Sequence, residues 1–137
     1  MTYQPDIVPL GTEGYLVRFA DMLDDQANRA VISFAAAVEQ AEIVGVVEVS
    51  TALASVFVRF ERSTASRADV VSALQALLGA RNWLADVKTQ AARLWRVPTL
   101  YGGEAGPQLR EAAELAGVSE QAAVRELSQT KVRVLAL

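Results

Sequence analysis

The 137-residue sequence contains no histidine and no cysteine. Their absence excludes a thiol nucleophile, a Ser-His-Asp triad, an imidazole general base and an ordinary zinc site, because each of these requires one of the two side chains. Any chemistry that the chain performs alone must therefore use Asp, Glu, Ser, Thr, Tyr, Lys or Arg. The lack of cysteine also agrees with a cytoplasmic location.

Long apolar runs are missing as well. The most apolar helical run, Val31 to Val38, is too short to cross a bilayer. The N-terminus lacks the basic start and the apolar core of a signal peptide. We therefore expect a cytoplasmic protein that does not enter the membrane.

Neither sign of charge dominates the sequence. Lys and Arg total 13 and Asp and Glu total 16, so the net charge of −3 creates no overall field that would attract nucleic acid or anionic lipid. Hydrophobic residues, in contrast, make up 52% of the chain. This material can form the core of one domain, or of one small domain and part of another.

The first 40 residues predict a strand followed by a helix. Tyr15–Phe19 has the β-branched and aromatic composition of a strand. An amphipathic helix follows, because apolar residues recur at helical spacing at Ala27, Val31, Phe34, Val38 and Ala41.

A hairpin and a second helix come next. Ile43–Val49 and Ser55–Phe60 are two strand-like runs so close in sequence that they predict an antiparallel hairpin. Ser66 and Asp69 have the spacing of a capping box, which predicts the start of a helix that Gly79 would end.

One more strand completes the pattern. Leu94–Leu100 is apolar except at Arg96 and Thr99, and predicts that strand. The resulting βαββαβ order is the ferredoxin-like arrangement of an α+β domain, an antiparallel sheet with two helices on one face. Ala80–Ala92 either extends the second helix or forms a linker packed on the domain, so we place this domain at residues 1–92.

The loop Tyr101–Pro107 contains three glycines and one proline in seven residues. Only Tyr101 and Glu104 carry side chains there with much chemistry to offer. Such loops often bind ligands or partners, although a plain turn explains the composition equally well. Glu104 is either an acid/base or ligand-orienting group or a solvated turn residue, and Tyr101 is either a packing residue or a substrate contact.

Two short helices and a strand are predicted after this loop. Pro107 fits the first helical position, Gly117 the end of the first helix and Ser119 the N-cap of the second. The helix pair resembles a helix-turn-helix motif, but residues 107–133 carry four basic and four acidic residues, so DNA binding is a remote alternative to plain helix packing. Lys131–Leu137 predicts a strand whose open edge favours self-association.

The segment Val97–Leu109 resembles the start of the second domain of the allophanate hydrolase subunit 1 family. This family includes the B component of the bacterial ATP-dependent 5-oxoprolinase and the Kip-type inhibitor of a sporulation histidine kinase, and it is similar to part of the carboxyltransferase region of urea carboxylase. Pro9–Phe19 and Gly45–Phe60 agree with the same family. The resemblance therefore spans nearly the whole chain.

The resemblance implies a ferredoxin-like domain followed by the incomplete start of a cyclophilin-like β-barrel domain at residues 93–137. It implies a component of a complex that hydrolyses 5-oxoproline or a ureido compound with ATP, which the complex uses, in partnership with a carboxyltransferase-like subunit 2. The alternative is a regulatory module that inhibits a sensor histidine kinase.

The candidate site residues lie in the glycine-rich loop. Glu104 is the catalytic candidate, and the substrate-binding candidates are Tyr101, Gly102, Gly103 and Gly106. No metal site is expected. Family members usually continue past Lys131–Leu137 into the rest of the barrel, and Leu100 and Leu127 replace a frequent Cys and His, so we expect the isolated chain to be inactive.

Overall fold

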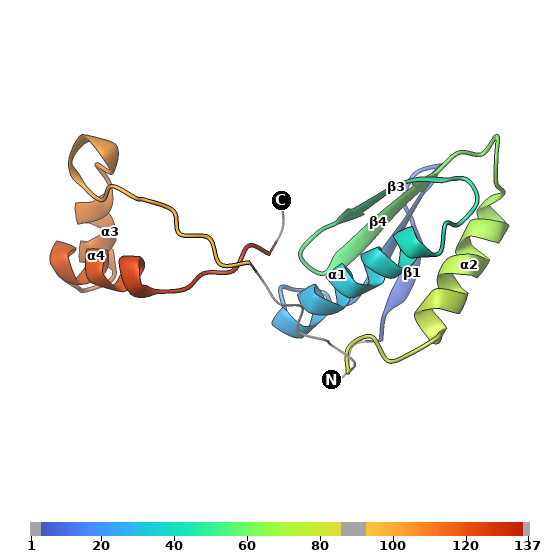
Figure 1. Ribbon diagram of the computed structural model, residues 1–137, viewed down its shortest axis with the longest axis horizontal. Helices are drawn as coiled ribbons and strands as arrows, with labels where there is room; N and C mark the ends of the chain where they lie inside the picture. Colours follow the sequence, from blue (N-terminus) through green and yellow to red (C-terminus); the bar gives the residue numbers. More distant parts are fainter. Residues whose placement is uncertain (1–3, 86–92, 136–137) are drawn as a thin grey trace. The chain divides into compact units, whose positions relative to one another are not determined.

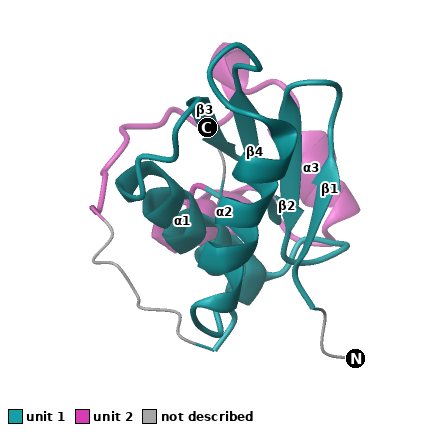
Figure 2. Cartoon of the chain, turned by 90° about the vertical axis from the view of Figure 1, so that its right-hand side faces the viewer, with its two compact units in different colours: residues 1–91, 135–137 teal, residues 92–134 magenta. Residues whose placement is uncertain are grey.

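The computed structural model describes residues 4–85 and 93–135. The chain divides into two compact units: unit 1 comprises Met1–Ala91 together with Leu135–Leu137, and unit 2 comprises Ala92–Val134 (Figure 2). Unit 1 holds a four-stranded sheet and two helices, and unit 2 holds two α-helices and a short 3₁₀ helix (Figure 1). The predicted α+β class is therefore confirmed. Within the described ranges, no helix has the length and apolar character needed to span a bilayer.

Unit 1 is built on an antiparallel sheet in the order β1-β2-β4-β3. The strands are β1 (Asp6–Pro9), β2 (Gly14–Arg18), β3 (Val46–Thr51) and β4 (Ser55–Phe60). The structure confirms the hairpin, as β3 and β4, and the predicted strand near residues 15–19, as β2. Because successive side chains of a strand alternate between faces, Val17 and its partner Val56 point to one face, and Leu16 and Phe57 to the other.

Two helices, α1 (Asp25–Gln40) and α2 (Arg67–Gly79), cover one face of the sheet (Figure 1). Each begins at a side-chain cap. The Ala27 N–H donates to Asp24 Oδ1 at 2.7 Å, and the Asp69 N–H donates to Ser66 Oγ at 3.1 Å. These bonds satisfy N–H groups that have no partner inside the helix, so the sequence defines both starting points locally.

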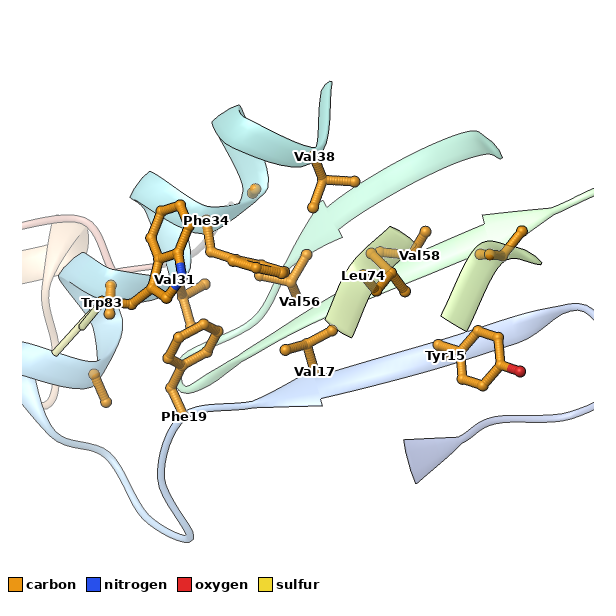
Figure 3. Packing of buried hydrophobic residues seen from close by; sticks show 14 of the residues in the cluster. Tyr15, Val17, Phe19, Val31, Phe34, Val38, Val56, Val58, Leu74 and Trp83 are labelled. Carbon is orange, nitrogen blue, oxygen red and sulfur yellow. The ribbon is translucent and has the colours of Figure 1, made fainter. Parts of the chain in front are cut away.

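The core lies between these helices and the sheet (Figure 3). Its large, fully buried hydrophobic side chains from the strands are Val17, Val56, Val58 and Phe60 in β2 and β4, and those from the helices are Val31, Phe34, Val38, Val70 and Leu74. The predicted helical spacing therefore identified the buried face of α1, except at Ala41, which is the exposed C-cap of the helix. Phe19, just beyond β2, packs on Phe34 with ring centroids 5.4 Å apart, which adds an aromatic contact to the apolar burial.

The segment after α2 packs on the domain instead of extending the helix. Helix α2 ends at Gly79, as predicted, and Trp83 folds back onto the core with an exposed fraction of 6%. Its indole ring meets Phe34 edge-on, at 5.0 Å between centroids and 86° between planes. The rest of the predicted connector, residues 86–92, lies outside the described residues.

The predicted strand at Leu94–Leu100 is wrong. This segment has no regular secondary structure, and its apolar side chains are exposed. The edge position beside β2 belongs instead to β1, so the element order of unit 1 is ββαββα. β1 reaches β2 through a short turn in which the Leu10 N–H donates to the Gly14 carbonyl at 2.9 Å. Closing so short a loop loses less chain entropy than recruiting a strand from far along the sequence.

Unit 2 contains the 3₁₀ helix η1 (Gly103–Ala105) and the helices α3 (Leu109–Leu115) and α4 (Glu120–Gln129). The helix pair was predicted, but α3 begins two residues after Pro107, the expected first position. Lys131–Leu137 was expected to be a strand. Its described part, residues 131–135, is not one, because no neighbouring strand pairs with it among the described residues.

The turn between α3 and α4 is as predicted. Gly117 has φ +69°, and its N–H donates to the Glu114 carbonyl at 3.1 Å, while the Val118 N–H donates to the Ala113 carbonyl at 3.0 Å. These two bonds form a Schellman motif, which places a glycine in the left-handed conformation. The N-cap of α4 is Ser119, whose Oγ accepts from the Ala122 N–H at 3.1 Å.

A buried asparagine joins distant parts of unit 1. Asn28, in α1, is fully buried, and its Nδ2 donates to the carbonyls of Leu53 and Leu135, each at 2.9 Å. Leu53 lies in the turn between β3 and β4. The same amide group therefore ties the hairpin turn and the returning end of the chain to one helix.

Candidate functional site

The glycine-rich loop is a closed turn. The Gly106 N–H donates to the Gly102 carbonyl at 3.1 Å, and the Leu109 N–H donates to the Gly106 carbonyl at the same distance. Gly102 and Gly103 have φ values of +77° and +57°. The glycines thus take conformations that other residues rarely adopt, and they lead the chain directly into α3.

The loop does not gather its chemical groups into a catalytic arrangement. The predicted residues Tyr101 and Glu104 are half-buried and exposed, respectively. Within the described part of the chain, neither side chain has a hydrogen-bond or ion-pair partner, and no group of three or more acidic residues could hold a metal ion. The loop carries one carboxylate and no cationic side chain, so it does not offer the positive charge that binds a nucleoside triphosphate such as ATP.

Alanine substitutions at two glycines of this loop should have different effects on its backbone. A Cβ at Gly106 would lie 2.9 Å from the backbone nitrogen of Gly102, whereas a Cβ at Gly103 would meet no atom within 4 Å. Gly106→Ala should therefore open the turn and shift the backbone amide resonances of residues 101–109 in a two-dimensional NMR spectrum. Gly103→Ala should lose only about 1–2 kcal/mol through its left-handed backbone. Small, equal shifts in both variants would contradict this steric account.

Unit 1 contains a separate open cleft that the sequence did not indicate. It has a volume of about 1520 Å³ and lies beside the loop after β2, the ends of β1 and β2, and the turn after α2. The polar residues that line it are Gln4, Asp6, Arg18, Asp21, Asp24, Gln26, Gln75, Arg81 and Asn82. These residues come from segments far apart in the sequence, so no local motif could have revealed them.

Arg81 occupies a defined position in this cleft. Its guanidinium carbon lies 3.8 Å from the centre of the Trp83 ring, a cation–π contact. Trp83 is itself fixed, because its Nε1–H lies 3.1 Å from the carbonyls of both Leu77 and Leu78. The last turn of α2 therefore holds the indole, and the indole holds the guanidinium.

A second cleft in unit 1, of about 570 Å³, lies between the end of α1 and the side of α2. Its lining is mainly apolar and small, with Ile43, Val44 and Leu77 as the large members. The ionisable groups on its rim are Glu42 and Asp69. Asp69 accepts a hydrogen bond from the Ser66 hydroxyl at 2.6 Å and is thus part of the cap of α2, which leaves this cleft without a catalytic pair.

Comparison with known proteins places the chain in a family. The family model described as carboxyltransferase domain, subdomain C and D, matches residues 5–137, and the chain belongs to this family. No curated protein sequence matches it.

Two solved proteins have similar structures. The conserved uncharacterized protein PH0987 from Pyrococcus horikoshii is 27% identical with a TM-score of 0.54, over 91% of this chain and 56% of that chain. TTHA0988 in one crystal form is 24% identical with a TM-score of 0.67, over 90% of this chain and 23% of that chain. A second crystal form of TTHA0988 gives 23% identity and the same TM-score, 0.67, over 92% of this chain and 22% of that chain. At these identities TTHA0988 supports the fold alone, and both proteins are much longer than the matched part.

Proposed function

We propose that this chain is a subunit 1-type component of an ATP-dependent amide hydrolase, similar to allophanate hydrolase subunit 1 and to the B component of 5-oxoprolinase. The observation that carries the proposal is the match of the carboxyltransferase subdomain C and D model to residues 5–137. Its partner would be a carboxyltransferase-like subunit 2. The complex would hydrolyse 5-oxoproline or a ureido compound, and ATP would bind to the complex outside the glycine-rich loop.

The proposed domain organisation is a ferredoxin-like domain with a linker at residues 1–92 and the incomplete start of a cyclophilin-like domain at 93–137. The first domain would be ferredoxin-like in having two helices on one face of an antiparallel sheet, although its element order is ββαββα and β1 takes the place of the expected last strand. Burial supports this division. In the described part of unit 2, the one buried hydrophobic side chain is Ala113. The large apolar side chains that unit 2 exposes are Leu94, Trp95, Val97, Leu100, Leu115, Leu127, Val132 and Val134. A segment with so little buried apolar surface gains stability when further polypeptide covers it.

The role of the chain in this complex would be to present a docking surface and one rim of the active site. Glu104 and Tyr101 are exposed and half-buried, respectively, in a loop of fixed backbone, so they are accessible to a substrate held by other parts of the complex. Gly102, Gly103 and Gly106 would shape that rim. The isolated chain would then lack hydrolytic activity.

The test is reconstitution with a purified subunit 2. We expect the chain to co-elute with subunit 2 in gel filtration, and we expect ATP hydrolysis that depends on 5-oxoproline or allophanate only when the second domain of a full-length subunit 1 is also supplied. A full-length subunit 1 from a related system is the positive control. Failure to bind subunit 2 under conditions in which that control binds, together with binding to the dimerisation helices of a histidine kinase, would replace the proposal with the regulatory alternative.

A further inference from the structure

The arginines of unit 1 differ in how they are paired. Three of them form ion pairs with carboxylates: Arg18 with Asp6, Arg29 with Asp25 and Arg59 with Glu48. Arg67 donates to the carbonyls of Gly11 and Thr12 and lies over the Tyr15 ring. Across residues 4–85 and 93–135, Arg81 has no carboxylate or carbonyl partner, although its guanidinium is held on Trp83.

This geometry leaves the donors of Arg81 available at the edge of the cleft. The N–H groups of a guanidinium lie in the plane of that group. When one face of the guanidinium lies over an aromatic ring, these N–H groups can still donate to both oxygens of one carboxylate. Because Trp83 already restricts the side chain, less rotational entropy is lost when a ligand binds. The Arg81 side chain is therefore held in a position from which it can bind a planar anion.

The other groups of the cleft limit the charge and shape of that anion. The lining carries the carboxylates of Asp6, Asp21 and Asp24 and the guanidinium groups of Arg18 and Arg81, a formal sum of −1 from three acids and two bases. Asp6 is paired with Arg18, and Asp24 caps α1. A ligand with a single negative charge meets less repulsion in this setting than a phosphate or a dicarboxylate.

The cleft also offers an apolar surface and a second donor. Met22 is 76% exposed, and it lines the cleft together with Leu84. Asn82 uses its Oδ1 to accept from the Ala85 N–H at 3.2 Å, so its Nδ2 remains a donor. A ligand with an apolar body and one carboxylate would satisfy both kinds of group.

We propose that the unit 1 cleft binds a small monocarboxylate, with its two oxygens on the Arg81 guanidinium and its apolar part against Met22 and Leu84. Such a carboxylate is present both on free organic acids and at the C-terminus of a peptide. This site is distinct from the glycine-rich loop and does not depend on the proposed hydrolase function.

The fluorescence of Trp83 can report ligand binding, because this side chain lies under Arg81. The chain has one other tryptophan, Trp95. In a Trp95→Phe background, fluorescence would report on the cleft alone. We expect N-acetyl-L-leucine to give a saturable change, and its amide, which lacks the negative charge, to give none. 4-Methylpentanoate, the free acid that has the carbon skeleton of leucine without the acetamido group, distinguishes the two sources, and tighter binding of N-acetyl-L-leucine would identify a peptide C-terminus.

Two arginine variants complete the test. Arg81→Gln should weaken N-acetyl-L-leucine binding at least about tenfold, the loss expected for one charge-assisted pair. Arg62→Gln is the matched control, since Arg62 is exposed, lies outside the cleft and should leave binding unchanged. Equal binding of the acid and its amide, equal binding of inorganic phosphate, or an unchanged affinity in a folded Arg81→Gln variant would each overturn the proposal.

Discussion

Val31→Asp should unfold unit 1, whereas Ile32→Asp should leave it folded. The two residues are neighbours on α1, but Val31 is fully buried and Ile32 is 39% exposed. An aspartate at position 31 would place an unpaired charge against the sheet, which destabilises a domain by several kcal/mol, a large part of the usual stability of about 5–15 kcal/mol.

Thermal unfolding followed by circular dichroism measures this difference. Both substitutions lower the helix propensity of α1 equally, so Ile32→Asp corrects for that effect, which is below about 1 kcal/mol. Leu74→Asp tests the same core from α2, where the side chain is also fully buried. Cooperative melting of Val31→Asp at the temperature of the parent would mean that the buried face of α1 is assigned incorrectly.

Trp83→Ala should have the second largest effect, a loss of about 3–5 kcal/mol in the free energy of unfolding, as for other large core aromatics. The substitution removes the contact with Phe34 and leaves a cavity beside the end of α2. Trp95→Ala is the control, because Trp95 is 73% exposed and its truncation should change stability by less than about 0.5 kcal/mol.

Chemical denaturation in urea distinguishes the two tryptophan variants. The Trp83→Ala midpoint should fall well below that of the parent, while the Trp95→Ala midpoint should coincide with it. Equal midpoints for all three proteins would show that the segment after α2 contributes nothing to the stability of unit 1. Because Trp83 also supports Arg81, this variant should be compared with Arg81→Gln, which keeps the indole and its packing.

Local signals in the sequence predicted the helices well. Ser66, Gly117 and Ser119 occupy the helix ends that their chemistry favours, and α2 ends at Gly79 as predicted, although without a left-handed glycine. Each of these positions depends on hydrogen bonds or backbone angles within a few residues, so the information is present in a short window. The spacing of apolar residues likewise identified the buried side of α1.

Strand partners were harder to predict, since a strand is completed by residues elsewhere in the chain. Leu94–Leu100 has strand-like composition but no neighbour among the described residues, while the four-residue β1, which contains Pro9, pairs with β2. Composition alone cannot decide between such candidates. The short turn that joins β1 to β2 was the relevant signal.

The two candidate sites also differ in whether their residues are close together in the sequence. The loop was visible in the sequence because its glycines are consecutive or nearly so. The cleft depends on Arg18, Asp21 and Arg81, which only the folded chain brings to one place.

The hydrogen bonds of Asn28 set an order of events during synthesis. Its two acceptors, on Leu53 and Leu135, lie 25 and 107 residues away along the sequence. The ribosome releases the hairpin turn long before it releases Leu135, so the first bond can form while the second donor hydrogen still lacks its acceptor. Unit 1 is therefore completed only after all of unit 2 has been translated, and a stalled or shortened chain would leave one N–H of the buried Asn28 Nδ2 group without its acceptor.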